Sequence, residues 1–284
     1  MAKDYKKIFP DTRNEGNTEL EKLQSTLTRM LCIFDDVCKE HNLTYWLDCG
    51  TLLGAVRHKG FIPWDDDVDL AMPRKDYERL KEIADDVLPK EIYFQTNKRD
   101  TAYRYYWAKL RDRKSIAMER WERNNEGKYH MGIMIDIFPY DYIKHPKSYF
   151  FFKNWFVCQF KNKTFNFLMR IIRGILVFSF RKKNVIKFAN WFYGRNKDTK
   201  YFGKGYDSPF RSVYEVQDIL PVKKIPFGKY EFCVPNNTNK YLTSLYGDYM
   251  TPPSIEEQKS SAHFLKFDVN KPCLFEEKLR KEGK

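Results

Sequence analysis

The sequence predicts an α+β fold in which helices flank a mixed β-sheet and a basic, aromatic, helical insert interrupts the chain. Three observations favour this class. Apolar residues repeat at helical spacing near the N-terminus, short β-rich runs with isolated acids follow, and positive charge gathers in one later segment. The 284 residues, 42% of them hydrophobic, can form one large domain or two small ones. Because no Gly- or Ser-rich linker, low-complexity tract or repeat divides them, we expect one domain with an insertion.

The helices of the first half have recognisable starts. Thr18 and Glu21 have the spacing of a capping box, in which each side chain bonds a free backbone N–H at the helix start. Apolar residues then recur every three or four positions, so a helix is expected over about 19–41. A short helix is expected at 50–57, and another after Pro73, which suits a helix start. A later helix is expected to end at Tyr246 and Gly247.

Short runs rich in β-branched and aromatic residues indicate the strands of the sheet. These runs are 43–47, 67–70, 92–95, 103–110, 133–138, 213–216 and 230–234.

Positive charge is concentrated between Lys144 and Lys204. This segment holds fifteen Lys or Arg, one acid and seventeen aromatic residues, a net charge of +14 against +13 for the whole chain. The remainder is therefore close to neutral. We expect an N-terminal extension at 1–17, a catalytic core at 18–143, a basic helical insert at 144–204, and the C-terminal part of the catalytic domain with a tail at 205–284.

The insert contains an apolar stretch at 164–180 that is broken by Arg170 and Arg173. Central charges argue against a membrane-spanning helix, which needs ~20 mostly apolar residues. The basic run Arg181, Lys182 and Lys183 beside an apolar, aromatic helix suits peripheral contact with an anionic membrane. An ordinary helical subdomain with a basic solvated face is the alternative. No nucleic-acid partner is expected, because nothing resembles a nucleic-acid-binding module.

The cysteines and the N-terminus indicate a cytoplasmic protein. The first residues have no apolar run after their charges, so a secretory signal is not expected. The six cysteines form no CxxC pair and no zinc-like spacing, which suits reduced thiols packed as small core residues. The membrane contact would then lie on the inner face of the cytoplasmic membrane.

Four carboxylates occur within the five residues 65–69. In a strand, Asp67 and Asp69 share one face while Val68 and Leu70 face a core. Two carboxylates ~5 Å apart repel by about 3 kcal/mol at an effective dielectric near 20. A divalent cation offsets this repulsion, and Mg²⁺ is typically held by one or two carboxylates plus phosphate oxygens of a substrate. The strand therefore predicts metal-assisted chemistry on a phosphate.

Two further pieces complete a candidate site. Gly50 and Thr51 lie at the start of a predicted helix, where backbone N–H groups can bind a phosphate. Asp136, between Ile135 and Ile137, should extend from a central strand as a third carboxylate. A small-residue turn, a carboxylate pair on a strand and a lone strand carboxylate form the layout of the nucleotidyltransferase fold. There the paired acids hold one or two Mg²⁺ and the third completes the site.

Basic residues between the turn and the acidic strand are candidate phosphate contacts. Arg57 is the strongest, because a guanidinium matches phosphate oxygens in a bidentate way. His58 and Lys59 follow it directly. Arg74 and Lys109 are weaker candidates, which we expect to be solvated charges.

Three blocks resemble a known family. The segment LLGAVRHKGFIPWDDDVD at 52–69 closely resembles the signature of the LicD family of phosphocholine transferases, which is related to the fukutin and fukutin-related proteins. The segment IDIFPYD at 135–141 resembles its second block. The segment LYGDYM at 245–250, followed by two prolines, resembles its C-terminal block. The resemblance spans about 43–263, and the basic insert is the part without a clear match.

The resemblance implies transfer of phosphocholine, or of a related phospho-alditol or phospho-alcohol group, from a CDP-linked donor such as CDP-choline. The acceptor would be a hydroxyl of a cell-surface glycan or lipid-linked glycan, such as lipopolysaccharide or teichoic acid. Asp67 and Asp69 would then bind Mg²⁺ or Mn²⁺, and Asp136 would be a further ligand or the base that takes the acceptor proton. Trp64 is the first candidate to face a choline headgroup, because aromatic rings bind quaternary ammonium ions.

Two alternatives remain open. The chain could be a conventional nucleotidyltransferase that releases diphosphate, or a non-catalytic protein that binds a membrane surface. Release of CMP would support transfer from a CDP-linked donor, whereas release of diphosphate would support a conventional nucleotidyltransferase. The retained acids argue against the non-catalytic reading, because uncompensated carboxylates have no purpose in an inactive site.

Overall fold

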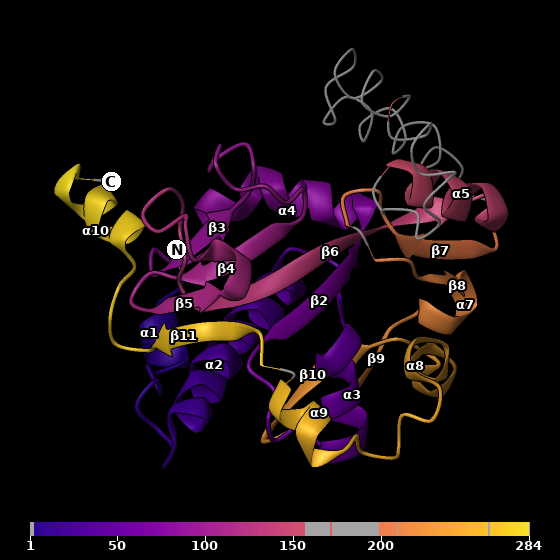
Figure 1. The fold of residues 1–284 in the computed structure, drawn as a ribbon, viewed down its shortest axis with the longest axis horizontal. Helices are drawn as coiled ribbons and strands as arrows, with labels where there is room; N and C mark the ends of the chain where they lie inside the picture. Colours follow the sequence, from indigo (N-terminus) through magenta and orange to yellow (C-terminus); the bar gives the residue numbers. More distant parts are fainter. Residues whose placement is uncertain (1–2, 157–170, 172–198, 209, 261, 284) are drawn as a thin grey trace.

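The computed structural model describes residues 3–156, 171, 199–208, 210–260 and 262–283, and they form the α+β fold that the sequence predicts (Figure 1). A seven-stranded mixed sheet lies at its centre. Strand β2 (Val68–Pro73) runs parallel to β6 (Met134–Ile143) along one edge of β6. The other edge is shared by two antiparallel strands, β4 (Ala108–Asp112) and β7 (Tyr201–Lys204).

The remaining strands extend this sheet or form small pairs beside it. Within the sheet, β1 (Trp46–Leu47) pairs with β2, β3 (Ile92–Gln95) pairs with β4, and β8 (Val213–Glu215) pairs with β7. Outside it, β9 (Lys223–Phe227) pairs with β10 (Tyr230–Val234), and β5 (Ile116–Glu119) pairs with β11 (Phe264–Asp268).

The longer helices pack around the sheet, and α2 supplies the largest share of helical core residues. They are α2 (Glu19–Glu40), α3 (Cys49–His58), α4 (Arg74–Val87), α5 (Pro146–Phe156) and α8 (Thr238–Tyr246). The shorter helices are α1 (Tyr5–Ile8), η1 (Arg120–Glu122), α7 (Val216–Ile219), α9 (Ile255–Ser260) and α10 (Leu274–Lys281). Helices α2 and α4 contact β6, and α3 lies between β2 and α8.

Local signals locate several elements correctly. The capping box is present, since the Thr18 side chain accepts from the Glu21 N–H and the Glu21 carboxylate accepts from the Thr18 N–H. The acidic strand alternates as predicted: Val68 and Leu70 are fully buried, whereas Asp67 and Asp69 are partly exposed. Gly247 ends α8, as expected.

Other boundaries differ from the predictions. The expected strand at 103–110 begins only at Ala108, because pairing with β6 begins at that residue. The strand expected at 133–138 continues to Ile143, because β7 pairs with its second half. The segment expected to be an insert therefore ends in a strand of the central sheet.

Part of the insert is outside the described residues. Its apolar stretch, apart from Ile171, and the basic run of Arg181, Lys182 and Lys183 lie there, as does Cys158. The other five cysteines are free thiols. Among the helices of the described part, none combines the length and the apolar character needed to cross a bilayer.

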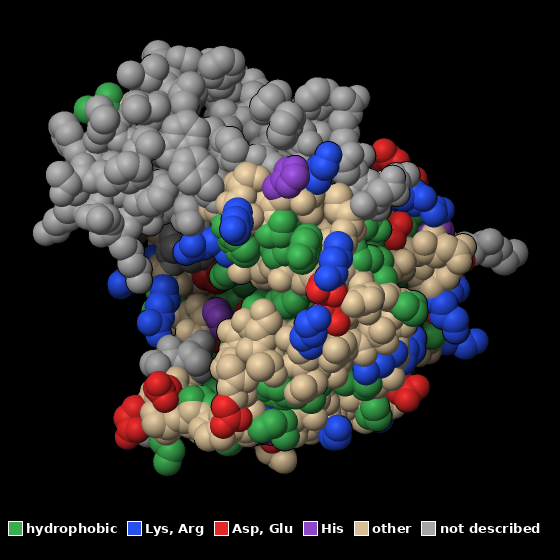
Figure 2. Space-filling view, turned by 90° about the vertical axis from the view of Figure 1, so that its right-hand side faces the viewer, with side chains coloured by type: hydrophobic (Ala, Val, Ile, Leu, Met, Phe, Trp, Pro, Cys, Tyr) green, Lys and Arg blue, Asp and Glu red, His purple; other side chains and the backbone are tan. Residues whose placement is uncertain are grey.

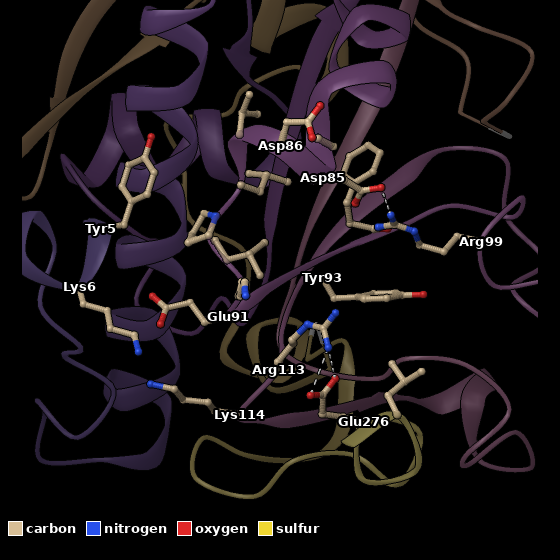
Figure 3. A pocket seen from close by; sticks show the side chains of 18 of the residues that line it. Tyr5, Lys6, Asp85, Asp86, Glu91, Tyr93, Arg99, Arg113, Lys114 and Glu276 are labelled. Carbon is tan, nitrogen blue, oxygen red and sulfur yellow. Dashed lines mark hydrogen bonds and ion pairs between the residues drawn. The ribbon is translucent and has the colours of Figure 1, made fainter. Parts of the chain in front are cut away.

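A groove of about 1380 Å³ lies between α1, the end of α4 and α10 (Figure 3). Several of its charged side chains have ion-pair partners. Arg99 bonds Asp85, Arg113 bonds Glu276, and one oxygen of Glu91 accepts from Arg29. None of the acids predicted for catalysis lines it, so we assign this groove no role in the chemistry.

Candidate active site

The three predicted acids lie together on one face of the sheet. Asp69 of β2 and Asp136 of β6 are direct neighbours in the parallel register, so their side chains share a face. Asp67 precedes β2 and stands two residues before Asp69, on the same side. Repulsion from Asp67 and Asp136 acts on the Asp69 carboxylate, as expected for neighbouring acids.

These acids are destabilised as carboxylates. Burial, followed by repulsion from Asp65, raises the pKa of Asp67 to about 8. Burial, followed by repulsion from Asp67, raises the pKa of Asp69 well above its ordinary value, although Lys204 acts in the opposite direction. Groups that repel each other in this way form a site for a cation, which would favour their ionised forms.

A second set of ligand atoms lies beside the first. Asp65, Asp66, Asp67 and His263 each offer one atom, and these atoms lie within 4.8 Å of one another. Burial raises the pKa of Asp65 to about 7, and its Oδ2 has no hydrogen-bond partner. His263 Nδ1 lies 3.0 Å from Asp66 Oδ1, and this bond raises the pKa of His263 to about 10.

His263 was not among the predicted site residues. It reaches the acids because Asp66 accepts the backbone N–H groups of His263 and Phe264, at 3.0 Å each, and so anchors the start of β11. The two residues are 197 positions apart. A local sequence pattern cannot reveal such a contact.

The residues present fit a divalent cation. Their donor set is almost entirely carboxylate oxygen, which suits Mg²⁺ or Mn²⁺. Asp65 Oδ2 has no hydrogen-bond partner, and the pKa values of Asp67 and Asp69 are raised, so a cation at this place would stabilise the ionised carboxylates.

Asp136 is held by two donors from β4 and the residue before it. Trp107 Nε1 donates to Oδ1 at 2.6 Å, and Lys109 Nζ donates to Oδ2 at 3.0 Å. The expectation that Lys109 and Arg74 are solvated was wrong. Lys109 is only 1% exposed, because Asp136 and Glu119 both pair with it. Arg74 bonds Asp141 in a bidentate way.

The predicted phosphate turn is the first turn of α3. Gly50 allows close packing there, because an added Cβ would lie 3.1 Å from Asp65 Oδ2 and that carboxylate would have to shift. The Thr51 hydroxyl accepts the backbone N–H of Asp69 at 2.9 Å and ties the helix to the acidic strand. The turn and the acids are thus joined directly.

A buried ion pair supports the start of α3. Asp48 caps the helix, is fully buried, and accepts from the Tyr241 hydroxyl at 2.6 Å. Lys204 Nζ lies 3.0 Å from Asp48 Oδ2 and is 1% exposed. The Lys204 ammonium also lies 4.1 Å from the ring centre of Phe138. The sequence predicts Lys204 to be part of the basic insert. In the structure it is the last residue of β7 and contacts the start of α3.

The predicted basic contacts lie at the other end of α3. Arg57 lies seven positions after Gly50, a rise of about 10 Å along a helix. Arg57 donates to the Tyr249 carbonyl at 2.7 Å and to His58 Nε2 at 2.9 Å, and Lys59 is exposed at the helix end. Trp64 meets His58 edge to face at 6.2 Å. Their contacts with a donor remain predictions.

The molecular surface is hollowed on the face drawn in Figure 2. A histidine and acidic side chains are visible in this hollow, and Lys and Arg side chains lie beside it. Acidic and basic groups side by side suit a ligand that carries phosphate and is bound with a cation.

We expect the free energy of unfolding of the metal-free protein to fall as pH rises from about 4 to about 8. Asp65 and Asp67 titrate near 7 and 8 in the folded protein but near 3.9 when unfolded, so the folded state binds more protons in this window. His263, with a raised pKa, acts in the same direction. Thermal unfolding from pH 5 to pH 8, with and without Mg²⁺, measures this.

The melting temperature should fall with pH without Mg²⁺, and Mg²⁺ should raise it more at pH 8 than at pH 5. Asp67→Asn should flatten the dependence. A melting temperature that does not change between pH 5 and pH 8 would contradict the electrostatic description of the site.

Comparison with protein families places this site in context. Residues 42–185 match the model of the LicD/FKTN/FKRP nucleotidyltransferase domain, which includes the turn, the acidic strand and Asp136. A "Lipopolysaccharide cholinephosphotransferase LicD" from Haemophilus influenzae is 28% identical over 260 residues, which cover 84% of this chain and 94% of that protein.

Shorter similarities concern other members. A "Ribitol 5-phosphate transferase FKRP" from Homo sapiens is 43% identical over 47 residues, 16% of this chain and 10% of that protein. An uncharacterised protein from Rickettsia prowazekii, RP689, is 46% identical over 48 residues, which are 17% of this chain and 18% of that protein.

Proposed function

Because the chain belongs to the LicD/FKTN/FKRP nucleotidyltransferase-domain family, we propose that it transfers phosphocholine, or a related phospho-alditol or phospho-alcohol group, from a CDP-linked donor to a hydroxyl of a cell-surface glycan. The chain is a transferase of a substituted phosphate group, the class of its named relatives. The single observation that carries the proposal is the register that puts Asp69 of β2 beside Asp136 of β6, with Asp67 two residues before Asp69.

Phosphoryl transfer depends on positioning and charge neutralisation more than on covalent catalysis. Asp67, Asp69 and Asp136 would hold Mg²⁺ or Mn²⁺, which supplies positive charge to the phosphate oxygens. The backbone N–H groups at the start of α3, near Gly50 and Thr51, would face the donor phosphates. Arg57, His58 and Lys59 remain candidate donor contacts at the far end of the same helix.

A conventional nucleotidyltransferase reaction is the second candidate, because the matched family model describes a nucleotidyltransferase domain. The products distinguish the two reactions. Incubation with Mg²⁺ and CDP-choline, CDP-ribitol, CDP-ethanolamine or nucleoside triphosphates, after a thermal-shift screen for binding, should yield CMP from one CDP-linked donor. Release of diphosphate, and no CMP from any donor, would refute the proposal.

The headgroup of the donor can be tested at Trp64. Trp64 precedes Asp65 in the sequence and is partly buried. Its ring packs edge to face with the His58 ring. If the headgroup is choline, Trp64→Ala should weaken CDP-choline binding by about 0.5–2 kcal/mol, the range of a cation–π contact. CMP binding, measured by calorimetry as the control, should change less. Equal losses for both ligands would show that Trp64 does not face the headgroup.

The acceptor follows from the relatives' names and not from geometry. The name of the Haemophilus relative supports lipopolysaccharide or a similar glycan as the acceptor. The name of the ribitol 5-phosphate transferases supports a phospho-alditol as the transferred group. Peripheral contact of the basic insert with an anionic cytoplasmic membrane rests on its sequence alone. Co-sedimentation with anionic vesicles at low and high salt would measure that contact.

A further inference from the structure

Asp136 differs from the other acids of the site in the way its carboxylate is held. Trp107 Nε1 lies 2.6 Å from Oδ1, and Lys109 Nζ lies 3.0 Å from Oδ2. Lys109 of β4 is the direct register partner of Asp136, and Trp107 is the residue just before β4. Each carboxylate oxygen therefore has a donor of its own.

Both donors are fixed in place. Trp107 is 6% exposed and its ring stacks on Tyr105 at 4.0 Å and lies 5.3 Å from Phe138. Lys109 is 1% exposed and also bonds Glu119 at 3.2 Å. Because neither side chain can swing away without disrupting these contacts, the two bonds fix the plane of the Asp136 carboxylate, which would otherwise rotate broadly.

The two donors leave Asp136 able to bind a cation. A carboxylate oxygen has two lone-pair sites, and one donor on each oxygen leaves one free. Asp136 is 7% exposed and lies in register beside Asp69 of β2. Partners that orient a metal ligand typically change metal affinity or activity by about 10–100-fold when they are removed.

We propose that Trp107 and Lys109 are positioning residues that hold Asp136 in one orientation as a ligand of the divalent cation. This inference rests on the proposed function, because it assigns roles at the same cation site. The indole N–H supplies orientation without charge. Lys109 supplies orientation and also offsets part of the negative charge of Asp136 and Glu119.

The uncharged donor allows the cleaner test, because its removal leaves the charge of the site unchanged. Trp107→Phe keeps an aromatic ring and removes only the N–H and part of the ring. The affinity of the full-length protein for Mn²⁺, followed by the electron paramagnetic resonance signal of free Mn²⁺, should fall by about tenfold or more. A thermal melt verifies that the variant is folded.

Trp46→Phe is the matched control. Like Trp107, Trp46 is buried, and its Nε1 lies 3.5 Å from the Tyr241 hydroxyl rather than on an acid of the cation site. Its loss should change Mn²⁺ affinity by less than about twofold, below the range for an orienting partner. A Mn²⁺ affinity of Trp107→Phe equal to that of the wild type would overturn the inference.

A second measurement needs no folded Trp107 variant. In the wild-type protein, the indole N–H resonance of Trp107 should shift saturably with added Mg²⁺ while that of Trp46 stays in place. Asp136→Asn should abolish the shift. An unmoved Trp107 resonance at saturating Mg²⁺ would overturn the inference, even if the enzyme still releases CMP from a CDP-linked substrate. A wild-type protein that binds neither Mn²⁺ nor Mg²⁺ would overturn both the inference and the metal-dependent function.

Discussion

Asp67→Asn and Asp69→Asn should each abolish turnover while the protein remains folded. Each change removes one carboxylate from the cation site, and loss of a single charge-stabilising group at a reacting centre typically costs at least about 100-fold in rate. Burial and mutual repulsion raise the pKa values of both acids, so neutralising one of them relieves an unfavourable interaction. The metal-free melting temperature should therefore hold or rise. CMP release and a thermal melt measure the two effects.

Asp86→Asn is the matched control for this experiment. Asp86 is an exposed acid of α4, outside the cation site, so its replacement should leave CMP release unchanged. Activity within about threefold of the wild type in either site variant, far less than removal of a charge-stabilising group should cost, would refute the two-ligand assignment.

Lys204→Met should be among the most destabilising single changes in the described part of the chain. Lys204 and Asp48 have side chains that are 1% and 0% exposed, and their charged atoms lie 3.0 Å apart. Removing one partner of a buried ion pair typically costs about 3–5 kcal/mol, because the other charge stays buried without compensation. Burial alone would lower the pKa of Lys204, but Asp48 raises it, so the lysine is charged in the folded protein. Denaturant unfolding measures the loss.

Two companion variants make this result specific. Lys200→Met removes an exposed lysine just before β7 and should leave the unfolding midpoint unchanged, because the ion pair of Lys200 with Glu215 is solvated. Asp48→Asn combined with Lys204→Met should lose less than the sum of the single variants, because neither charge is then left alone. Strict additivity would show that Lys204 acts by packing rather than by charge.

Local order along the chain determined several features without the tertiary structure. The capping box and the helical repeat of apolar residues locate α2, because both depend on neighbours three or four positions apart. The spacing of Asp67 and Asp69 puts both on one face of a strand, because alternation in a strand is a property of the backbone. The shape of the acidic motif, and its resemblance to the family that the comparisons confirm, were therefore readable from residues 52–69 alone.

Only the tertiary structure decided what surrounds those acids. His263 reaches Asp66 across 197 positions, and Lys204 reaches Cys49 across 155. Their contacts depend on β11 and β7, strands whose pairing partners are far away in the sequence. A count of charges along the sequence assumes that each lysine is solvated. The sequence alone therefore assigns Lys204 to a basic insert and Lys109 to the surface. A buried lysine needs partners that offset its charge. Strand pairing, which no local pattern encodes, brings the carboxylates of Asp48 and Asp136 to Lys204 and Lys109.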